Sequence, residues 1–502
     1  MTLRISTVLA LSAVFAAAET VPVPTITALP VTASSRPFMA ADHTMDPEDL
    51  SKSGYVEAEF LVSGKANVYD WGSDGAVSVK TAGAPYTGKI LVRRPAEPSK
   101  FSGTVVVELM NPARRFDWGM MWGYLHDYLI ERGDAWVGIT MPGSVAGLQK
   151  FDPSRYASLS FANPNPSEVC AAPARGRGRG RGPAGPSATE DGLRWDMISQ
   201  VAAALKSTGK NMPFAGLRVD RVYMTTQIGD LETYMNAIHP RATLADGKPA
   251  YDGYLVKNPT APARISNCGS APGRGDAHAL IQDLNVPVIA VAAQGEVIGS
   301  LAFRRPDADG PNGRYRLYEI AGAAHIDKFA YGSGFPAIAD QKTAVGSAQG
   351  DASWPFNAMC DPPIPLSEHP LLKYSYDAAL MNLDAWSRKG IAPPKEERMQ
   401  VTEGPMPELV MDEFGHAKGG VRNPWVDEPT ATYTTTSPGP GTCAELGHVI
   451  PFTAERIKML YPSERVYAKK VDADVDALVK ARWFTESDGK KMKASLPAAF
   501  GK

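Results

Sequence analysis

Polar side chains that could carry out acyl transfer follow four apolar runs of this sequence. Asn111 follows "VVVELM", the turn "TTQIG" at 225–229 follows "RVYM", Glu296 follows "VPVIAVAAQG", and His325 follows "RLYEIAGAA". Reactive groups of an open α/β sheet gather where its strands end, so we expect these four places to lie together. Their order along the chain is that of oxyanion loop, nucleophile, acid and base. The sequence therefore predicts a site for nucleophilic hydrolysis.

His325 is the predicted general base, and Glu296 is the predicted acid. An imidazole titrates near neutral pH, so it can take a proton from a nucleophile and return it to a leaving group. A carboxylate beside the ring would fix its tautomer and stabilise its cation. A structural loop histidine and a surface glutamate are the competing interpretations. The sequence has no cluster with metal-ligand spacing and no phosphate-binding glycine loop, so neither a metal nor a cofactor is predicted.

The turn leaves the identity of the nucleophile open, because it contains no serine and no cysteine. A strained turn between strand and helix needs small residues two places before and after its apex. Thr225 and Gly229 then place Gln227 at the apex. An amide is not a nucleophile, whereas the hydroxyl of Thr226 could attack if a base activated it. Sterics thus favour Gln227 and chemistry favours a threonine. Backbone N–H groups near Asn111 and Gln227 are the predicted oxyanion donors.

The elements that must position these residues alternate between strand and helix. The valine-rich run "GTVVVELMN" is typical of a strand buried on both faces, and "MMWGYLHDYLIER" reads as a helix that stops at Gly133. Further strands are predicted in "RVYMTT", "YDGYLV", "VPVIAVAAQ" and "RYRLYEIA", and helices in "GLRWDMISQVAAALKST", "LETYMNAIHP" and "DAHALIQDL". This alternation predicts an α/β fold with a mostly parallel central sheet, helices on both faces, and helical and loop decorations after about residue 346.

The first residues predict the compartment. Residues 1–18 contain one arginine, an apolar run and then small residues, which is typical of a secretory signal peptide. Residues 19–47 read as an extended N-terminal segment, and residues 48–502 as one domain. A secreted or periplasmic location would allow two disulfides, in any of three pairings. The four cysteines are Cys170, Cys268, Cys360 and Cys443.

A run of alternating arginine and glycine near 172–190 is predicted to be a disordered insertion. Such a run can bind nucleic acid, but no aromatic or basic platform accompanies it, and the net charge of the chain is −2. After the leader, no apolar run approaches the roughly 20 residues that a membrane helix needs. The predicted partner is a small ester-like molecule, with no nucleic acid and no membrane. The oligomeric state is left open.

Several long motifs carry a family resemblance that extends from about Tyr55 to Leu496. The motifs include "PYTGKILVRRP", "EDGLRWDMISQV", "TYMNAIHP", "YDAALMNLDAWSRKGIAPP" and "GGVRNPWVDEPTATY". Together they resemble the large secreted, esterase-like proteins of the alpha/beta hydrolase domain family. The resemblance implies the α/β-hydrolase fold and a triad of serine, acid and histidine. "GAAHID" is similar to the family's histidine motif and assigns that role to His325.

Two positions depart from the family pattern. The family's turn resembles G-x-S-Q-S/T-G. Matching its glutamine and glycine puts Thr226 in the serine's place, whereas counting back from "LETY" puts Thr225 there. The family's acid region resembles E-x-D, and here Glu296 matches the glutamate while Ile298 replaces the aspartate.

Three functions follow from these residues. The leading hypothesis is a secreted hydrolase that cleaves an ester or related acyl bond through Thr226, Glu296 and His325. The second is a hydrolase or lyase without a covalent intermediate, in which His325 activates water or abstracts a proton and Gln227 polarises a carbonyl. The third is a catalytically degenerate binding protein that keeps the hydrolase fold.

Overall fold

The computed structural model describes residues 20–72, 75–170, 186–273, 275–348, 369–439 and 441–498, together with 356–357, 360, 364–365 and 500. The predicted signal peptide at 1–18 lies outside these residues, and so does most of the predicted Arg/Gly insertion, at 171–185. The last part of that insertion is ordered, because Thr189 forms an antiparallel bridge with Ala162.

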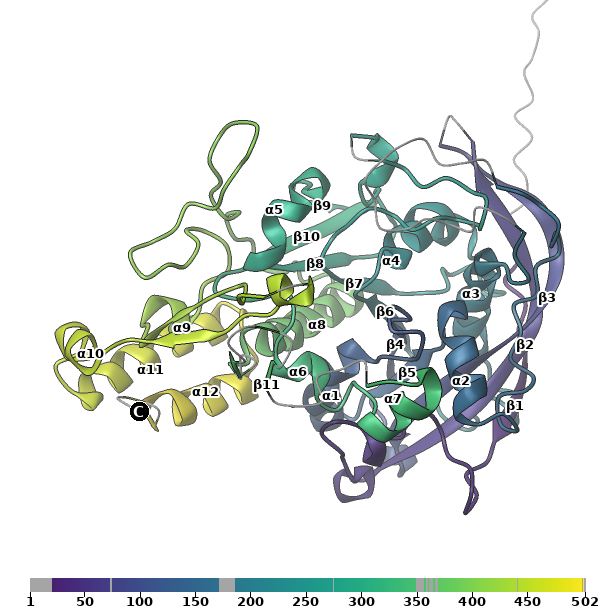
Figure 1. Ribbon diagram of the computed structural model, residues 1–502, viewed down its shortest axis with the longest axis horizontal. Helices are drawn as coiled ribbons and strands as arrows, with labels where there is room; N and C mark the ends of the chain where they lie inside the picture. Colours follow the sequence, from purple (N-terminus) through teal and green to yellow (C-terminus); the bar gives the residue numbers. More distant parts are fainter. Residues whose placement is uncertain are drawn as a thin grey trace, which may run out of the picture.

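A ten-stranded sheet forms the centre of the molecule, in the order β1-β2-β3-β5-β4-β6-β7-β8-β10-β9 (Figure 1). Strands β5, β4, β6, β7, β8 and β10 run parallel, and the others are antiparallel to their neighbours. The strands are β1 (Thr25–Leu29), β2 (Tyr55–Trp71), β3 (Val77–Pro95), β4 (Thr104–Leu109), β5 (Ala135–Ile139), β6 (Arg221–Thr226), β7 (Gly253–Lys257), β8 (Val288–Ala293), β9 (Ala308–Gly310) and β10 (Gly313–Ile320). Two short hairpins lie outside it, β11–β12 (Phe356–Asn357, Ile364–Pro365) and β13–β14 (Ala431–Tyr433, Val449–Pro451).

Helices follow or precede most strands of the parallel part. They are α1 (Met120–Arg132), α2 (Val145–Phe151), α3 (Arg194–Leu205), α4 (Asp230–Thr233), α5 (Val297–Ser300), α6 (Lys328–Tyr331), α7 (Ile338–Val345), α8 (Leu371–Lys389), α9 (Pro424–Asp427), α10 (Ala454–Leu460), α11 (Glu464–Lys480) and α12 (Glu486–Ala498). After α4 the chain continues as a π-helix at Tyr234–Ile238, so the helix predicted in "LETYMNAIHP" is present but partly widened.

Apolar residues alternate between the two faces of the sheet. In β4, Val106 packs in the core cluster that contains α1 and α8, whereas Val105 and Val107 pack in the cluster that contains α3. Successive strand side chains point to opposite faces, so a run without polar residues requires cover on both sides. The predicted α/β class, with a mostly parallel sheet and helices on both faces, is therefore confirmed.

Helix α1 is fixed at both ends by residues that the sequence places there. The buried carboxylate of Glu108 in β4 accepts hydrogen bonds from the backbone N–H groups of Met121 and Trp122, at 2.8 and 2.9 Å. It thus occupies the anion position at the helix N-terminus. Gly133 ends the helix with φ 71°, the left-handed conformation that glycine adopts without strain. The predicted stop at Gly133 is confirmed.

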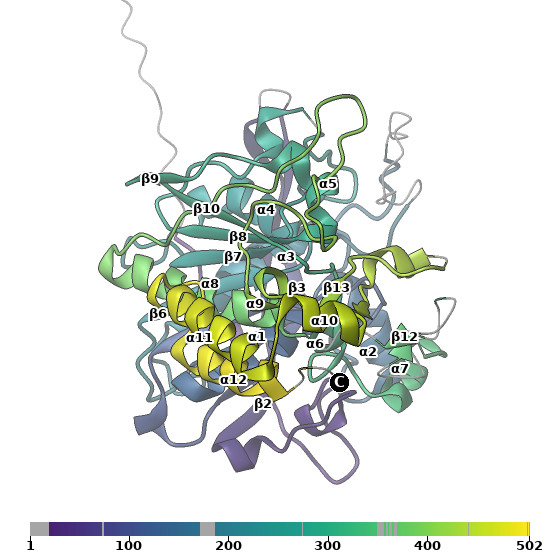
Figure 2. The same ribbon diagram turned by 90° about the vertical axis from the view of Figure 1, so that its left-hand side faces the viewer.

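The C-terminal segment packs onto the same core as α1. Val471 of α11 and Met492 of α12 belong to the cluster that holds Trp122 and Leu383. Figure 1 shows α10, α11 and α12 together at the end of the molecule away from the long strands β2 and β3, and Figure 2 shows this end facing the viewer. In the part of the chain that the structure describes, no helix is long and apolar enough to cross a membrane.

One predicted helix is wrong. "DAHALIQDL" forms only a 3-10 turn at Ala277–Ala279. The side-chain amide of Asn236 donates to the carbonyls of His278 and Leu280, at 3.0 and 2.9 Å. These are backbone acceptors that a continuing helix would have used, so a tertiary contact overrides the local preference.

The four cysteines form two disulfides, Cys170–Cys268 and Cys360–Cys443. The second disulfide holds Cys443, which is close to Glu445 in the sequence. The carbonyl of Glu445 accepts a hydrogen bond at 3.0 Å from the N–H of Ile326, the residue after His325. This disulfide therefore fixes a wall of the site described next.

Candidate functional site

The ends of five neighbouring strands converge on one edge of the sheet. Asn111 lies just after β4, Thr226 is the last residue of β6, and Lys257 is the last residue of β7. Glu296 lies in a 3-10 turn after β8, and His325 follows β10. Because β4, β6, β7, β8 and β10 are consecutive and parallel in the sheet, their carboxyl ends bring these side chains together.

Glu296 and His325 form a directly bonded pair. Nδ1 of His325 donates to Oε1 of Glu296, and the other carboxylate oxygen accepts from the N–H of Ala293 at 2.7 Å. Nζ of Lys257 lies 3.0 Å from Oε1 of Glu296. Burial raises the pKa of a carboxyl, but the charge of Lys257 and the hydrogen bonds from His325 and Ala293 outweigh it and hold the pKa of Glu296 below its ordinary value. Glu296 is therefore ionised at neutral pH.

Gln227 occupies the position opposite the free nitrogen of the imidazole. Its Nε2 lies 3.0 Å from Nε2 of His325, and its Oε1 accepts from Nδ2 of Asn111 at 2.6 Å. The bond from Asn111 fixes the orientation of the amide, so an N–H of Gln227 points at the imidazole. With Nδ1–H directed to Glu296, Nε2 carries the lone pair that accepts this bond. The turn therefore directs Gln227, the apex residue that the steric argument predicts, at the imidazole.

The two threonines of the turn point elsewhere. Oγ1 of Thr226 donates to the carbonyl of Leu109 at 2.8 Å, and the residue is 1% exposed. Oγ1 of Thr225 is buried without a hydrogen-bond partner among the described residues. The structure therefore brings His325, Glu296, Gln227 and Asn111 together, and it directs the Thr226 hydroxyl into the sheet.

Backbone donors around Asn111 are already used. The N–H of Met110 donates to the carbonyl of Ile139 at 3.1 Å, and that of Asn111 to the carbonyl of Trp118 at 2.9 Å. The donor that Asn111 offers to the site is accordingly its side-chain amide, which contacts Gln227. The N–H of Ile228, the residue after the apex, lies 3.4 Å from Oγ1 of Thr226, a long hydrogen bond.

Two charged residues at this edge of the sheet were not among the site residues predicted from the sequence. Lys257 ends the apolar strand "GYLVK", and a lysine at the end of a buried run is the signal that could have revealed it. Asp327 caps α6 by accepting from the N–H of Phe329 at 3.0 Å, and burial raises its pKa to about 7. Both residues are buried, so each must be paired or neutral.

A pocket of about 260 Å³ opens beside the pair. Its polar lining residues are Asn258, Thr260, Glu296, Ser300, His325 and Glu445. A small polar group fits this volume and lining better than a long acyl chain does. No group of three His, Cys, Asp or Glu side chains converges as a metal site within the described ranges.

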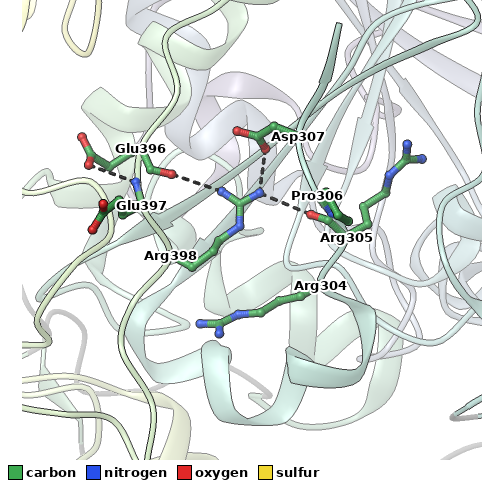
Figure 3. Close-up of a pocket in the computed structure, with 7 residues that line it drawn as sticks. All are labelled: Arg304, Arg305, Pro306, Asp307, Glu396, Glu397 and Arg398. Carbon is green, nitrogen blue, oxygen red and sulfur yellow. Dashed lines mark hydrogen bonds and ion pairs between the residues drawn. The ribbon is translucent and has the colours of Figure 1, made fainter. Parts of the chain in front are cut away.

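A second pocket, of about 480 Å³, lies between residues 304–307 and 396–398 and shares no residue with the first (Figure 3). Its three arginines are paired with carboxylates: Arg304 with Glu319, Arg305 with Asp283 and Arg398 with Asp307. Each guanidinium charge of this pocket is therefore compensated by a carboxylate.

The strand order agrees with the sequence comparison. The family model described as alpha/beta hydrolase domain matches residues 21–494. The chain belongs to the alpha/beta hydrolase domain family. None of the curated protein sequences matches the chain.

Solved structures that are similar to this member of the family include several esterases. Esterase Est22 is 12% identical over 50% of this chain and 68% of its own, with a TM-score of 0.25. The glucuronoyl esterase from Solibacter usitatus is 10% identical over 53% of this chain and 77% of its own, also with a TM-score of 0.25. An alpha-beta serine hydrolase homologue from Coxiella burnetii is 10% identical over 47% and 82%, with a TM-score of 0.24. These values are too low to carry an argument about substrate or mechanism.

Proposed function

We propose that this alpha/beta hydrolase cleaves an ester or related acyl bond by activating water with His325 and Glu296, without an acyl-enzyme intermediate. One observation carries the proposal: the imidazole nitrogen that would deprotonate a nucleophile faces Gln227, which cannot attack, rather than a hydroxyl. The contact between Nδ1 of His325 and the ionised Glu296 supports the proposal, because a carboxylate in this position orients the imidazole and stabilises its cation.

The chemistry then runs through water. A water molecule takes the place of the Gln227 amide at Nε2 of His325 and gives up its proton there while its oxygen attacks the carbonyl carbon. The tetrahedral intermediate collapses when the imidazolium returns that proton to the leaving oxygen. The products are an acid and an alcohol, and His325 is neutral again. The side-chain amides of Asn111 and Gln227 are the donors available to the developing oxyanion.

A covalent route through Thr226 is less well supported. Its hydroxyl would have to release the carbonyl of Leu109 and leave a buried position before it could approach His325. Thr226 is β-branched and buried at the end of β6, which opposes such a rotation of its side chain. The geometry therefore favours water over Thr226 as the nucleophile.

A second candidate function is ligand binding without catalysis. It is favoured by the same contact, because the Gln227 amide already occupies the nitrogen that general-base catalysis requires. In that case the pocket beside His325 would hold a small polar ligand that is released unchanged.

We also propose that the protein works outside the cytoplasm. The leader-like residues 1–18 support this location, and so do the two disulfides, because such bonds persist in oxidising compartments.

The test is a panel of short-chain p-nitrophenyl esters combined with an organophosphate probe and mass spectrometry. We expect turnover by the wild type, no covalent adduct, and a loss of about 10²- to 10⁴-fold in His325→Ala. His43→Ala is the control, since His43 pairs with Asp42 at the surface. An adduct on Thr226 would establish the covalent route, and absence of turnover with retained binding of the product acid would establish the binding protein.

A further inference from the structure

Lys257 makes contact with both halves of the candidate catalytic pair. Its side chain is 0% exposed, and Nζ lies 3.0 Å from Oε1 of Glu296 and 3.0 Å from the backbone carbonyl of His325. Oε1 of Glu296 is the same oxygen that accepts from Nδ1 of the imidazole. One ammonium group therefore bridges the acid and the loop that carries the base.

We propose that Lys257 is a positioning residue that fixes Glu296 against the histidine loop and offsets the carboxylate charge that faces the imidazole of His325. The inference rests on the proposed function only for its catalytic meaning. A carboxylate stabilises a neighbouring imidazolium, and a cation on the same carboxylate weakens that effect. Neutral imidazole is the form that can accept a proton from water.

The other groups around the pair do not supply this charge. Asp327 lies on the same loop, and burial raises its pKa to about 7. Tyr124 of α1 and Tyr376 of α8 approach the pair from the helices, and burial keeps both phenols neutral by raising the pKa of each well above its ordinary value. Glu445 lies across the pocket. Of the residues that the structure describes, Lys257 is the cation that hydrogen-bonds Glu296.

Backbone contacts give Lys257 the rigidity that a positioning role needs. It is the last residue of β7, which pairs with β8 through Lys257 and Val291. The next residue, Asn258, has φ 58° and donates its N–H to the carbonyl of Val291 at 2.8 Å. A non-glycine residue in this region is held there by its surroundings. The strand end is thus anchored directly beside Glu296.

The test follows the titration of the His325 ring by NMR in protein with ¹³C-labelled histidine, with His325→Gln to assign the signal. In Lys257→Met, which removes the charge and keeps the chain length, we expect the titration midpoint of the ring to rise by about one pH unit or more. Lys257→Arg, which keeps the charge, should stay near the wild type. Lys373→Met is the matched control, because Lys373 is also buried but pairs with Asp127 and Asp377.

The readout does not depend on turnover. If the wild type hydrolyses esters, the acidic limb of the pH profile of kcat/KM should move to higher pH in Lys257→Met, together with the NMR midpoint. A merely structural role would not produce this shift. If the wild type proves inactive, the proposed function fails while the NMR result still decides the role of Lys257. Lys257→Gln serves as a second neutral variant should Lys257→Met not fold. An unchanged or lowered midpoint in the folded neutral variant overturns the inference.

Discussion

Nε2 of Gln227 lies 3.0 Å from Nε2 of His325, in the place where an α/β hydrolase presents its nucleophile to its base. The amide is held there from its other side by Asn111, whose Nδ2 donates to Oε1 of Gln227 at 2.6 Å. The site therefore combines the candidate base His325 and the candidate acid Glu296 with a turn residue that cannot form an ester.

Replacing Gln227 by serine should create a covalent ester hydrolase. The new hydroxyl would lie at the apex, next to the free nitrogen of His325, and an activated hydroxyl attacks esters far faster than an amide does. We expect turnover of p-nitrophenyl acetate to rise at least about 10²-fold, with a burst and an organophosphate adduct at position 227. Gln400→Ser, at an exposed position, is the control and should change neither. A variant that folds but shows no adduct would mean that the apex is not aligned with the base.

The two adjacent threonines should respond oppositely to substitution by valine. Thr226→Val removes a buried hydrogen bond to Leu109 and should lower the free energy of unfolding by about 1 kcal/mol. Thr225→Val removes a buried hydroxyl without a partner among the described residues, so it should be neutral or stabilising. Denaturant unfolding measures both. Under the water mechanism, ester turnover of Thr226→Val should stay within about threefold of wild type, whereas a loss of several orders of magnitude would support attack by Thr226.

Glu232→Gln should make the protein more stable at alkaline pH. Burial raises the pKa of Glu232 to about 8 from 4.5, although Oε1 accepts from the N–H of Thr260 at 3.0 Å. A raised carboxyl pKa means that the folded state holds the proton more tightly, so stability is full below pH 4.5 and falls as pH rises to 8. One pKa unit is worth about 1.4 kcal/mol, so the fall is at most about 5 kcal/mol.

Glutamine keeps the acceptor and cannot ionise, so this part of the pH dependence should disappear in the variant. Urea unfolding at pH 5, 7 and 9 measures it. Glu131→Gln, on the outer face of α1, is the control and should follow the wild-type curve. Equal pH dependence in wild type and Glu232→Gln would show that Glu232 does not ionise in this range.

Breaking the disulfide Cys360–Cys443 should reduce activity more than breaking Cys170–Cys268. The two bonds span 83 and 98 residues, so each contributes a similar stabilisation, about 4–5 kcal/mol from loop closure. Only the first is attached to the segment at Glu445, which lines the pocket and accepts a backbone hydrogen bond from Ile326. Paired Cys→Ser variants, compared by thermal unfolding and by ester turnover, separate the two effects. Equal loss of activity in both variants would contradict the inference that Cys360–Cys443 holds the pocket-lining segment in place.

The sequence by itself determined the fold and the edge of the sheet at which the site lies. Buried valine-rich runs such as the one ending at Leu109 cannot face water on either side, so they require a covered parallel sheet, and their polar ends must meet at one edge. Asn111, Gln227, Glu296 and His325 could be named because each lies a few residues or less after the end of such a run. The end of helix α1 at Gly133 could also be predicted from the local sequence, since glycine adopts a positive φ without strain.

Only the tertiary structure decided which side chain of the turn faces the imidazole. Neighbouring residues in a strand point to opposite faces, so a shift of one position along the turn places an amide rather than a hydroxyl opposite the imidazole. The sequence motifs were compatible with either placement. The hydrogen bond from Thr226 to Leu109 depends on the neighbouring strand β4, 117 residues away. The bridge from Lys257 to Glu296 and His325 joins three separate strand ends. Contacts between distant segments leave no periodicity in the sequence, which is why these two features appeared only in three dimensions.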